Sequence, residues 1–220
     1  RFDVCTTAPV YDEQGRVRVR FSWERGGADE HNNRAWLRVS QSHAGAGFGQ
    51  HQLPRIGHEV LVSFIDDDPD QPIITGELHH ATNVHPWSLP EHKARSGVRT
   101  RTHNGEGYNE LHFDDTPEAE RIHLHAQRDL DLHTGHDRID RIENDRHLNV
   151  AGSRYTSVEG DDHQHHQGDD NRQTGGDHHQ STGGSAHLSA GAAQLVEAGQ
   201  EIHHNAGMKV VIEAGAEITL

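Results

Sequence analysis

The stretch that decides the fold is the C-terminal one, which reads GQEIHHNA at 199–206, GMKVVIEA at 207–214 and GAEITL at 215–220. Glycine opens each unit, and a fixed internal period indicates a stacked repeat rather than one globular core. Eight residues suit a strand of about five or six residues followed by a sharp corner. Glycine favours such corners because it adopts positive φ without steric cost. The period therefore predicts a series of short β-strands.

The same period extends back through the last third of the chain. The glycines that carry it are Gly152, Gly160, Gly168, Gly176, Gly184, Gly191, Gly199, Gly207 and Gly215. The step from 184 to 191 is seven residues, next to glycine doublets at 175–176 and 183–184. One octad is therefore expected to have lost a turn residue at this point.

Apolar residues mark an expected inner face of the strands. Counted from the glycine, the third and fifth positions lie on the same strand face, because side chains alternate along a strand. The last octads place Ile202, Val210, Ile218 and Ile212 there. Counted in the same way, earlier octads place polar residues there, among them His163, His165 and His179.

Such strands bury too little apolar surface in one chain to offset their ordering entropy. Either 153–190 is disordered, or the inner face is narrow and polar and is completed by other chains. The retained glycine register favours the second interpretation, since disorder requires no register.

Composition limits the classes of partner. Only 31% of the 220 residues are hydrophobic, which is low for a self-sufficient core. The net charge of −15 argues against binding to nucleic acid or to an anionic membrane surface. The single cysteine, Cys5, allows no intrachain disulfide.

The first third of the chain has a different pattern. Alternating or apolar runs predict strands at 16–23, 36–39, 56–64 and 73–78, with a glycine-rich loop at 44–49. Several short strands over about 80 residues favour a small closed barrel. A connector rich in proline and glycine follows at 83–110, and strand alternation resumes at 111–113 and 122–126. No convincing amphipathic helix is found.

Six motifs in order resemble one known family. They are WLRVSQ at 36–41, AG and GFG within 44–49, LPRIGHEVLV at 53–62, DPDQPIITG at 68–76, NELHFDD at 109–115 and ERIHLHA at 120–126. They resemble the valine-glycine-repeat (VgrG) spike proteins of type VI secretion, which are related to the central spikes of contractile phage tails. The resemblance implies an all-β homotrimer with an oligonucleotide/oligosaccharide-binding (OB) type barrel followed by a triple-stranded, intertwined β-helix. The expected boundaries are 1–82 for the barrel, 83–110 for the connector and 111–220 for the spike, with glycine octads from about 152.

The resemblance also implies a mechanical role. A spike of this kind punctures target envelopes and carries effectors, and it is assembled in the bacterial cytoplasm and secreted on firing into a target cell or the extracellular space. The implied partners are the other two copies, a capping protein at the C-terminal tip, effectors, and the secretion tube protein through an N-terminal base. The chain begins without Met and ends on a strand-like segment, so both ends are expected to be cuts and the base to be missing.

Two other hypotheses compete with the spike. The first is a monomeric, histidine-rich metal-binding repeat module, since the chain has 23 histidines. The second is a carbohydrate-active enzyme on a single-chain β-helix. No nucleophile motif, phosphate loop or zinc-protease motif is present, so no enzyme is expected.

Several histidine and acidic residues have the spacing of metal ligands. His123-x-His125 and His163-x-His165 place two rings on one strand face, which is a workable start of a metal site. A threefold axis would bring copies of His163, His165 and His179 together, so an axial metal or anion is an alternative to a wet polar interior; no other cofactor is expected. Asp66, Asp68, Asp70 and Glu77 match the spacing of a calcium loop, but glutamine stands where the loop needs glycine, so a solvated turn is expected.

Overall fold

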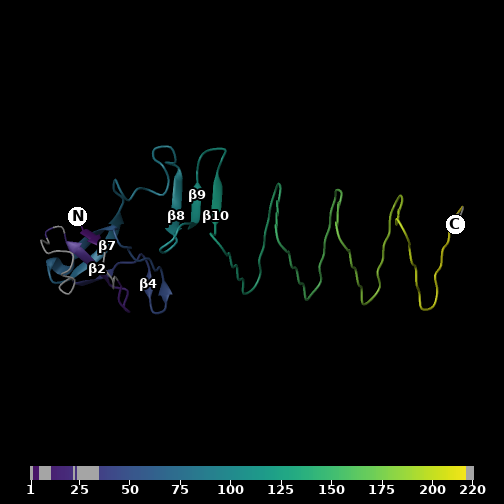
Figure 1. The fold of residues 1–220 in the computed structure, drawn as a ribbon, viewed down its shortest axis with the longest axis horizontal. Helices are drawn as coiled ribbons and strands as arrows, with labels where there is room; N and C mark the ends of the chain where they lie inside the picture. The colour runs from purple at the N-terminus through teal and green to yellow at the C-terminus, as the bar shows by residue number, and fades with distance from the viewer. Residues whose placement is uncertain (1, 5–10, 22, 24–34, 217–220) are drawn as a thin grey trace. The chain divides into compact units, whose positions relative to one another are not determined.

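A computed structural model describes residues 2–4, 11–21, 23 and 35–216 (Figure 1). The chain divides into two units, 1–141 and 142–220, which are described separately. The described residues form β-strands and extended segments, with one 3₁₀ turn, η2 (Ile65–Asp67), and no α-helix. The expected all-β class is confirmed. None of the described elements is a helix of the length and apolarity that crossing a membrane requires.

The first unit begins with a closed barrel. Its strands are β1 (Phe2–Val4), β2 (Val17–Phe21), β3 (Trp36–Val39), β6 (Glu59–Phe64) and β7 (Pro72–Leu78). They follow each other around the barrel in the order β1-β2-β3-β7-β6, and β1 closes it by pairing with β6. The β3–β7 pair is parallel and the others are antiparallel. The small closed barrel predicted from the first third is confirmed.

Strand alternation builds the barrel core. In β2, Val17 and Val19 are fully buried while Arg20 is exposed, as a strand with one face inward requires. The fully buried apolar residues of the described chain are few: Val17, Val19, Leu37, Pro54, Val60 and Ile74. The buried run ends before Trp23, which is 62% exposed although its spacing matches the valines.

Two loops of the barrel have more regular structure than the sequence indicated. The stretch 44–49, expected as a loop, is a hairpin of β4 (Ala44–Gly45) and β5 (Phe48–Gly49). The calcium-like turn is closed by Asp68, whose carboxylate accepts hydrogen bonds from the backbone of Asp70 and the side chain of Gln71. Glu77, the last of the four acidic residues, contacts the His58 ring at 2.9 Å.

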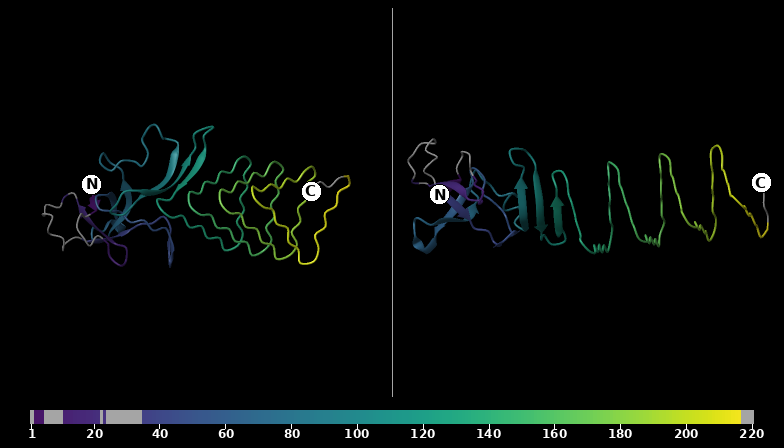
Figure 2. Two further views of the ribbon diagram at one scale, coloured as in Figure 1. Left: turned by 45° about the vertical axis from the view of Figure 1, so that its right-hand side comes forward. Right: turned by 90° about the horizontal axis from the view of Figure 1, so that it is seen from below.

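A second sheet follows the barrel (Figure 2). It consists of β8 (Arg95–Arg101), β9 (Tyr108–Asp114) and β10 (Arg121–His125), antiparallel, with β9 in the centre. The range 83–110, expected as a connector, therefore contains β8 and the first residues of β9.

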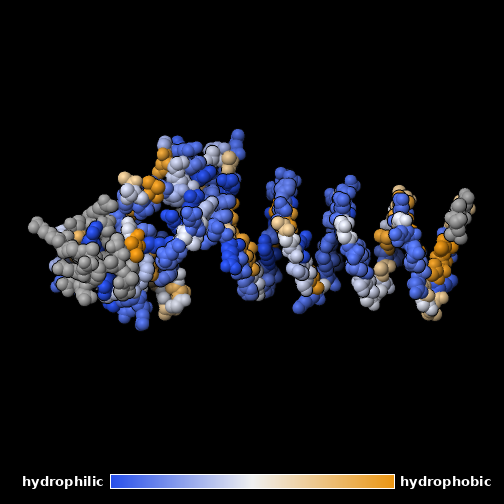
Figure 3. All heavy atoms as spheres, viewed as in Figure 1, coloured by the Kyte–Doolittle hydropathy of each residue, from blue (hydrophilic) through white to orange (hydrophobic). Residues whose placement is uncertain are grey.

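Beyond the second sheet, the described part of the chain is extended and does not pair with other segments. Every described residue from 127 to 216 is exposed, and no strand pairing occurs among them. The second unit turns back and forth in open turns, and gaps remain between the turns even when all atoms are drawn (Figures 1 and 3). Each segment thus has unpaired backbone groups on both edges.

The bends of this region fall at strict intervals of eight. The first bend begins at residue 127 and the last at 215, with a bend at every eighth position between them. The expected loss of one turn residue is therefore wrong. A bend occupies two residues, and glycine stands at the second of them from Gly152 to Gly184 and at the first from Gly191 onward. The doublets at 175–176 and 183–184 fill both places, so the glycine spacing changes while the structural period does not.

The reason for glycine also differs from the expected one. None of the described bend glycines adopts a positive φ, whereas Gly47 and Gly57 in the barrel unit do. Within the single chain, a Cβ at any of the described bend glycines would meet no atom within 4 Å. Neither backbone conformation nor crowding within the chain requires these glycines, so any steric requirement for them must come from outside it.

The constant period changes the alignment of the columns. Ile202 and Val210 lie three residues after the first bend residue, whereas His163 and His179 lie four residues after it. Because side chains alternate along a strand, these histidines are on the face opposite to the isoleucine and valine. His165, six residues after its bend, is on the histidine face. The expectation that the two groups form one column is corrected.

Candidate assembly surfaces

One face of the second sheet is apolar and uncovered. It carries Val98 of β8, Leu111 and Phe113 of β9, and Ile122 and Leu124 of β10, which are 56%, 43%, 42%, 70% and 53% exposed. Val98, Leu111 and Leu124 are direct cross-strand partners, and Phe113 pairs with Ile122. We call these five residues the apolar sheet face. A contiguous apolar surface of this kind marks an interaction site on a soluble protein.

The opposite face of the same sheet is polar and buried. Glu110, His112 and Asp114 are only 4%, 3% and 8% exposed. The segment before β8 contacts this face: the Trp87 ring meets the His112 ring edge-on with centroids 5.7 Å apart. Arg99 reaches the same segment, donating a 2.8 Å hydrogen bond to the Pro86 carbonyl. The sheet therefore has its charged side within its own chain and its apolar side outward.

Ion pairs make that burial tolerable. Arg95 donates to Asp114 at 2.7 Å, and the hydroxyl of Thr116 donates to the same carboxylate at 2.7 Å. The hydrogen bonds from Thr116 and Arg95 hold the pKa of Asp114 far below its ordinary value. Burial would raise the pKa of Glu110, but hydrogen bonds from Arg99 and His112 outweigh it and lower that pKa.

Side-chain pairs in the octads show which positions share a face. Three pairs that are two residues apart join the third and fifth positions after a bend: Arg138–Asp140 at 3.3 Å, Asp162–Gln164 at 3.0 Å and Asp170–Arg172 at 2.7 Å. A fourth, Glu201–His203 at 2.7 Å, joins the second and fourth positions and lies on the opposite face. Ile202 and Val210 occupy the third position and Ile212 the fifth, so these apolar residues share the face that carries ion pairs in earlier octads.

The surface of a single chain is far larger than that of a folded monomer. The chain exposes 20460 Å², whereas a folded protein of its 24.5 kDa exposes about 10,000 Å². The excess accompanies the uncovered backbone of 127–216 and the apolar sheet face. Unpaired backbone groups and apolar surface on this scale require other chains as partners.

Comparison with known families agrees that the chain needs other chains as partners. Residues 96–206 match the family described as the bacteriophage T4 gp5 C-terminal trimerisation domain. Residues 5–79 match the type VI secretion system/phage-baseplate injector OB domain. The chain belongs to the gp5 C-terminal trimerisation-domain family. The trimerisation match begins inside β8 and therefore includes the second sheet and most of the octads.

Three relatives illustrate the similarity. The chain is 49% identical over 133 residues to the type VI secretion system spike protein VgrG3 of Vibrio cholerae, covering 60% of this chain and 13% of the relative. It is 50% identical over 133 residues to the actin cross-linking toxin VgrG1 of Vibrio cholerae, covering 60% of this chain and 12% of the relative. It is 43% identical over 141 residues to the spike protein VgrG5 of Pseudomonas aeruginosa, covering 60% of this chain and 18% of the relative. The chain thus spans less than a fifth of the length of these relatives.

The predicted glycines stand at bends, and Ile202, Val210 and Ile212 are 49%, 56% and 66% exposed in the single chain. Ile218 lies outside the described residues. The predicted glycines are Gly152, Gly160, Gly168, Gly176, Gly191, Gly199, Gly207 and Gly215.

The sequence analysis missed the role of the polar sheet face. The alternation Glu-x-His-x-Asp at 110–114 was the available signal, but it resembles the polar, solvent-facing side of an ordinary strand. Nothing in the comparisons supports the alternative of a histidine-rich metal-binding repeat module. Among the described residues, the octad histidines form no group of three potential metal ligands.

Proposed function

We propose that this segment is the barrel and shaft of a homotrimeric spike that a type VI secretion apparatus drives through a target envelope. The observation that carries the proposal is the series of extended octads, which have a strict period but no partner within their own chain. A repeat that is regular without internal pairing is complementary to further copies of itself. The gp5-type trimerisation match supports three copies rather than another number.

In this proposal the three chains interleave. The second and third chains occupy the gaps between the turns of the first and pair with its free backbone edges, at a strand spacing of about 4.8 Å. Pairing on both sides removes lateral edges from the shaft, which otherwise would invite aggregation. Many short hydrogen bonds then act together along the axis, and this arrangement resists axial load without a thick core.

The third and fifth positions of each octad face the axis in this proposal. The inner layers then change along the shaft, from Asp and Arg pairs such as Asp170–Arg172 to apolar layers such as Val210 and Ile212. The bend glycines allow neighbouring chains to approach the corners closely. The apolar sheet face packs against its copies at the start of the shaft and supplies apolar burial that the early octads lack.

The remaining partners follow from the family. A capping protein on the C-terminal tip, the secretion tube protein through an N-terminal base, and attached effectors are proposed partners. Assembly in the bacterial cytoplasm and release into a target cell or the medium are proposed locations. This segment is proposed to be non-enzymatic; the toxin named among the relatives places actin cross-linking in a protein of which this chain covers 12%.

Secretion tests the proposal directly. A full-length spike carrying this segment is expected to restore release of the tube protein to the medium in a strain that lacks its own spike genes. The same spike with Val210→Asp is expected not to, because three carboxylates without a basic partner would be buried in an apolar layer of the axis. Equal secretion by both spikes would contradict the proposal.

A further inference from the structure

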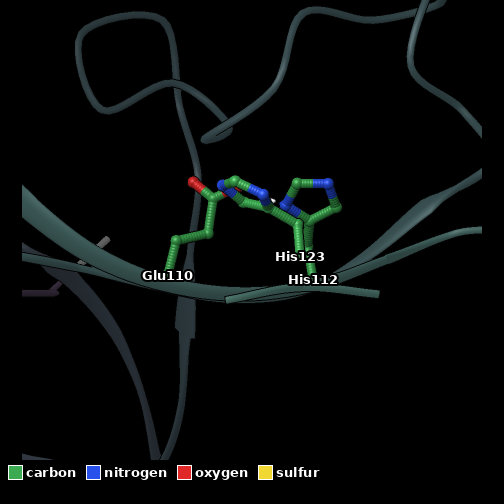
Figure 4. Close-up of side chains that lie close together, drawn as sticks. All are labelled: Glu110, His112 and His123. Carbon is green, nitrogen blue, oxygen red and sulfur yellow. Dashed lines mark hydrogen bonds and ion pairs between the residues drawn. The ribbon is translucent and has the colours of Figure 1, made fainter. Parts of the chain in front are cut away.

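A group of three side chains on the polar sheet face has the composition of a metal site. Glu110, His112 and His123 each offer one ligand atom, and these atoms lie within 4.8 Å of one another. Figure 4 shows the three side chains close together, with the imidazole rings side by side. Strand register explains the grouping, since His112 and His123 are direct partners on β9 and β10, and Glu110 is two residues from His112 on the same face.

The state of His112 is the second, independent observation. Its Nδ1 contacts the Glu110 carboxylate, so Nδ1 carries the hydrogen, and in the neutral ring Nε2 then presents a lone pair. That Nε2 is buried and has no hydrogen-bond partner among the described residues. An unmet acceptor in a residue only 3% exposed costs free energy unless a ligand satisfies it.

The surroundings favour a cation at this nitrogen. Both oxygens of Glu110 are engaged, one by Arg99 and one by His112, so the guanidinium charge is already neutralised. A carboxylate that accepts Nδ1–H from a histidine is the usual support behind a metal-binding imidazole. The His123 ring lies beside that of His112, with centroids 4.9 Å apart and planes inclined by 39°. His123 is only half-buried.

Gly97 of β8 leaves space beside His112 on the polar sheet face. It is the cross-strand partner of His112 on β8, and a Cβ at this position would lie 2.6 Å from the His112 Cα. A side chain there would crowd the polar face next to the imidazole.

We propose that His112 Nε2 and a ring nitrogen of His123 bind a divalent ion of the zinc class, with Glu110 orienting His112. Two imidazoles backed by a carboxylate suit Zn²⁺, Co²⁺, Ni²⁺ or Cu²⁺ rather than Ca²⁺ or Mg²⁺. The ion links β9 to β10 within one chain, where the barrel unit leads into the octads. The site does not depend on the trimer, so it can be present even if the spike proposal fails.

Trp87 provides a local reporter for the test. Its ring contacts His112, and Co²⁺ quenches tryptophan fluorescence at short range whereas Zn²⁺ does not. Titration of the full chain with Co²⁺ is expected to give saturable quenching that Zn²⁺ reverses and that is lost in Trp87→Phe. Absence of a saturable, Trp87-dependent component in the unaltered protein would overturn the proposal.

Matched variants separate this site from the many other histidines. His123→Gln is expected to weaken the Trp87-dependent binding at least 10-fold, and Glu110→Gln by about 10- to 100-fold. His125→Gln is the control and should leave binding unchanged, because His125 lies on the same strand face but outside the group of three. Equal binding by the His123 and His125 variants would refute the assignment.

A crystallographic measurement on the unaltered protein covers the case in which a variant fails to fold. Diffraction from zinc-soaked crystals above and below the zinc edge should show an anomalous peak within bonding distance of His112 Nε2 and His123. The absence of a peak at this position would contradict the proposal.

Discussion

Ile122→Ala tests whether the apolar sheet face is an interface between copies. Burying an isoleucine side chain completely stabilises by about 1.5–3 kcal/mol. Ile122 is 70% exposed in the single chain, so roughly 1.5 kcal/mol per chain is still to be gained on assembly. Three copies in one trimer give about 4–5 kcal/mol, which corresponds to about three powers of ten in the trimer dissociation constant.

The matched control is Ile139→Ala. Ile139 is 85% exposed and lies four residues after its bend, on the face opposite to the Arg138–Asp140 pair. The spike proposal places it towards solvent in the trimer, so Ile139→Ala should change the free energy of trimer dissociation by less than about 0.5 kcal/mol.

Sedimentation equilibrium across a urea series measures both variants against the unaltered chain. The expected result is a trimer of three times 24.5 kDa in each case, with Ile122→Ala dissociating at much lower urea. The same urea dependence for both variants would refute the reasoning, because two exposed isoleucines would then be equivalent.

Three further predictions concern register, space and charge. Deleting Gly183 shortens one octad to seven residues and turns the side chains of the following strand to the opposite face, so trimers should be lost. Deleting all eight residues 176–183 keeps the period and should leave the trimer intact. Light scattering measures the oligomeric state of both variants, and the reverse pattern would exclude a strict period of eight. Gly97→Ala places a Cβ 2.3 Å from the Leu111 carbonyl oxygen at a φ of +152°, so the free energy of unfolding in urea should fall by about 1–3 kcal/mol. The control is Gly76→Ala, whose Cβ meets only a flexible side-chain atom at 3.7 Å and should lower the free energy of unfolding less. Equal losses in the two variants would contradict this reasoning. Because the pKa of Asp114 is lowered in the folded chain, its stabilisation is present above the unfolded pKa of about 3.9 and is lost as pH falls below it. Melting curves between pH 5 and about 2 should therefore fall more steeply for the unaltered protein than for Asp114→Asn, and parallel curves would argue against this linkage.

The sequence was sufficient for the fold class and for the elements with strong alternation. The valines of β2 and the apolar run of β6 repeat with the period of a strand, so their burial could be predicted. The octad period was equally clear, but its register was not. Glycine moves from one bend position to the other between Gly184 and Gly191, and counting from glycine therefore shifted the histidine columns by one residue.

The polar sheet face could not be predicted for a different reason. In β9 the buried residues are Glu110, His112 and Asp114, while Leu111 and Phe113 are exposed. Hydrophobic alternation states which residues share a face, but not which face its own chain covers. That choice is made by the segment containing Pro86 and Trp87 and by the arginines of β8, which are contacts between residues distant in sequence.

Hydrogen exchange of the backbone amides from 142 to 216 tests the central claim most directly. If copies of the chain pair with every free strand edge, amides between the bends should be strongly protected, with faster exchange recurring every eighth residue at the bends. Exchange at the rate of an unstructured peptide throughout this range would mean that no neighbouring strands are present, and the account of the shaft would be contradicted.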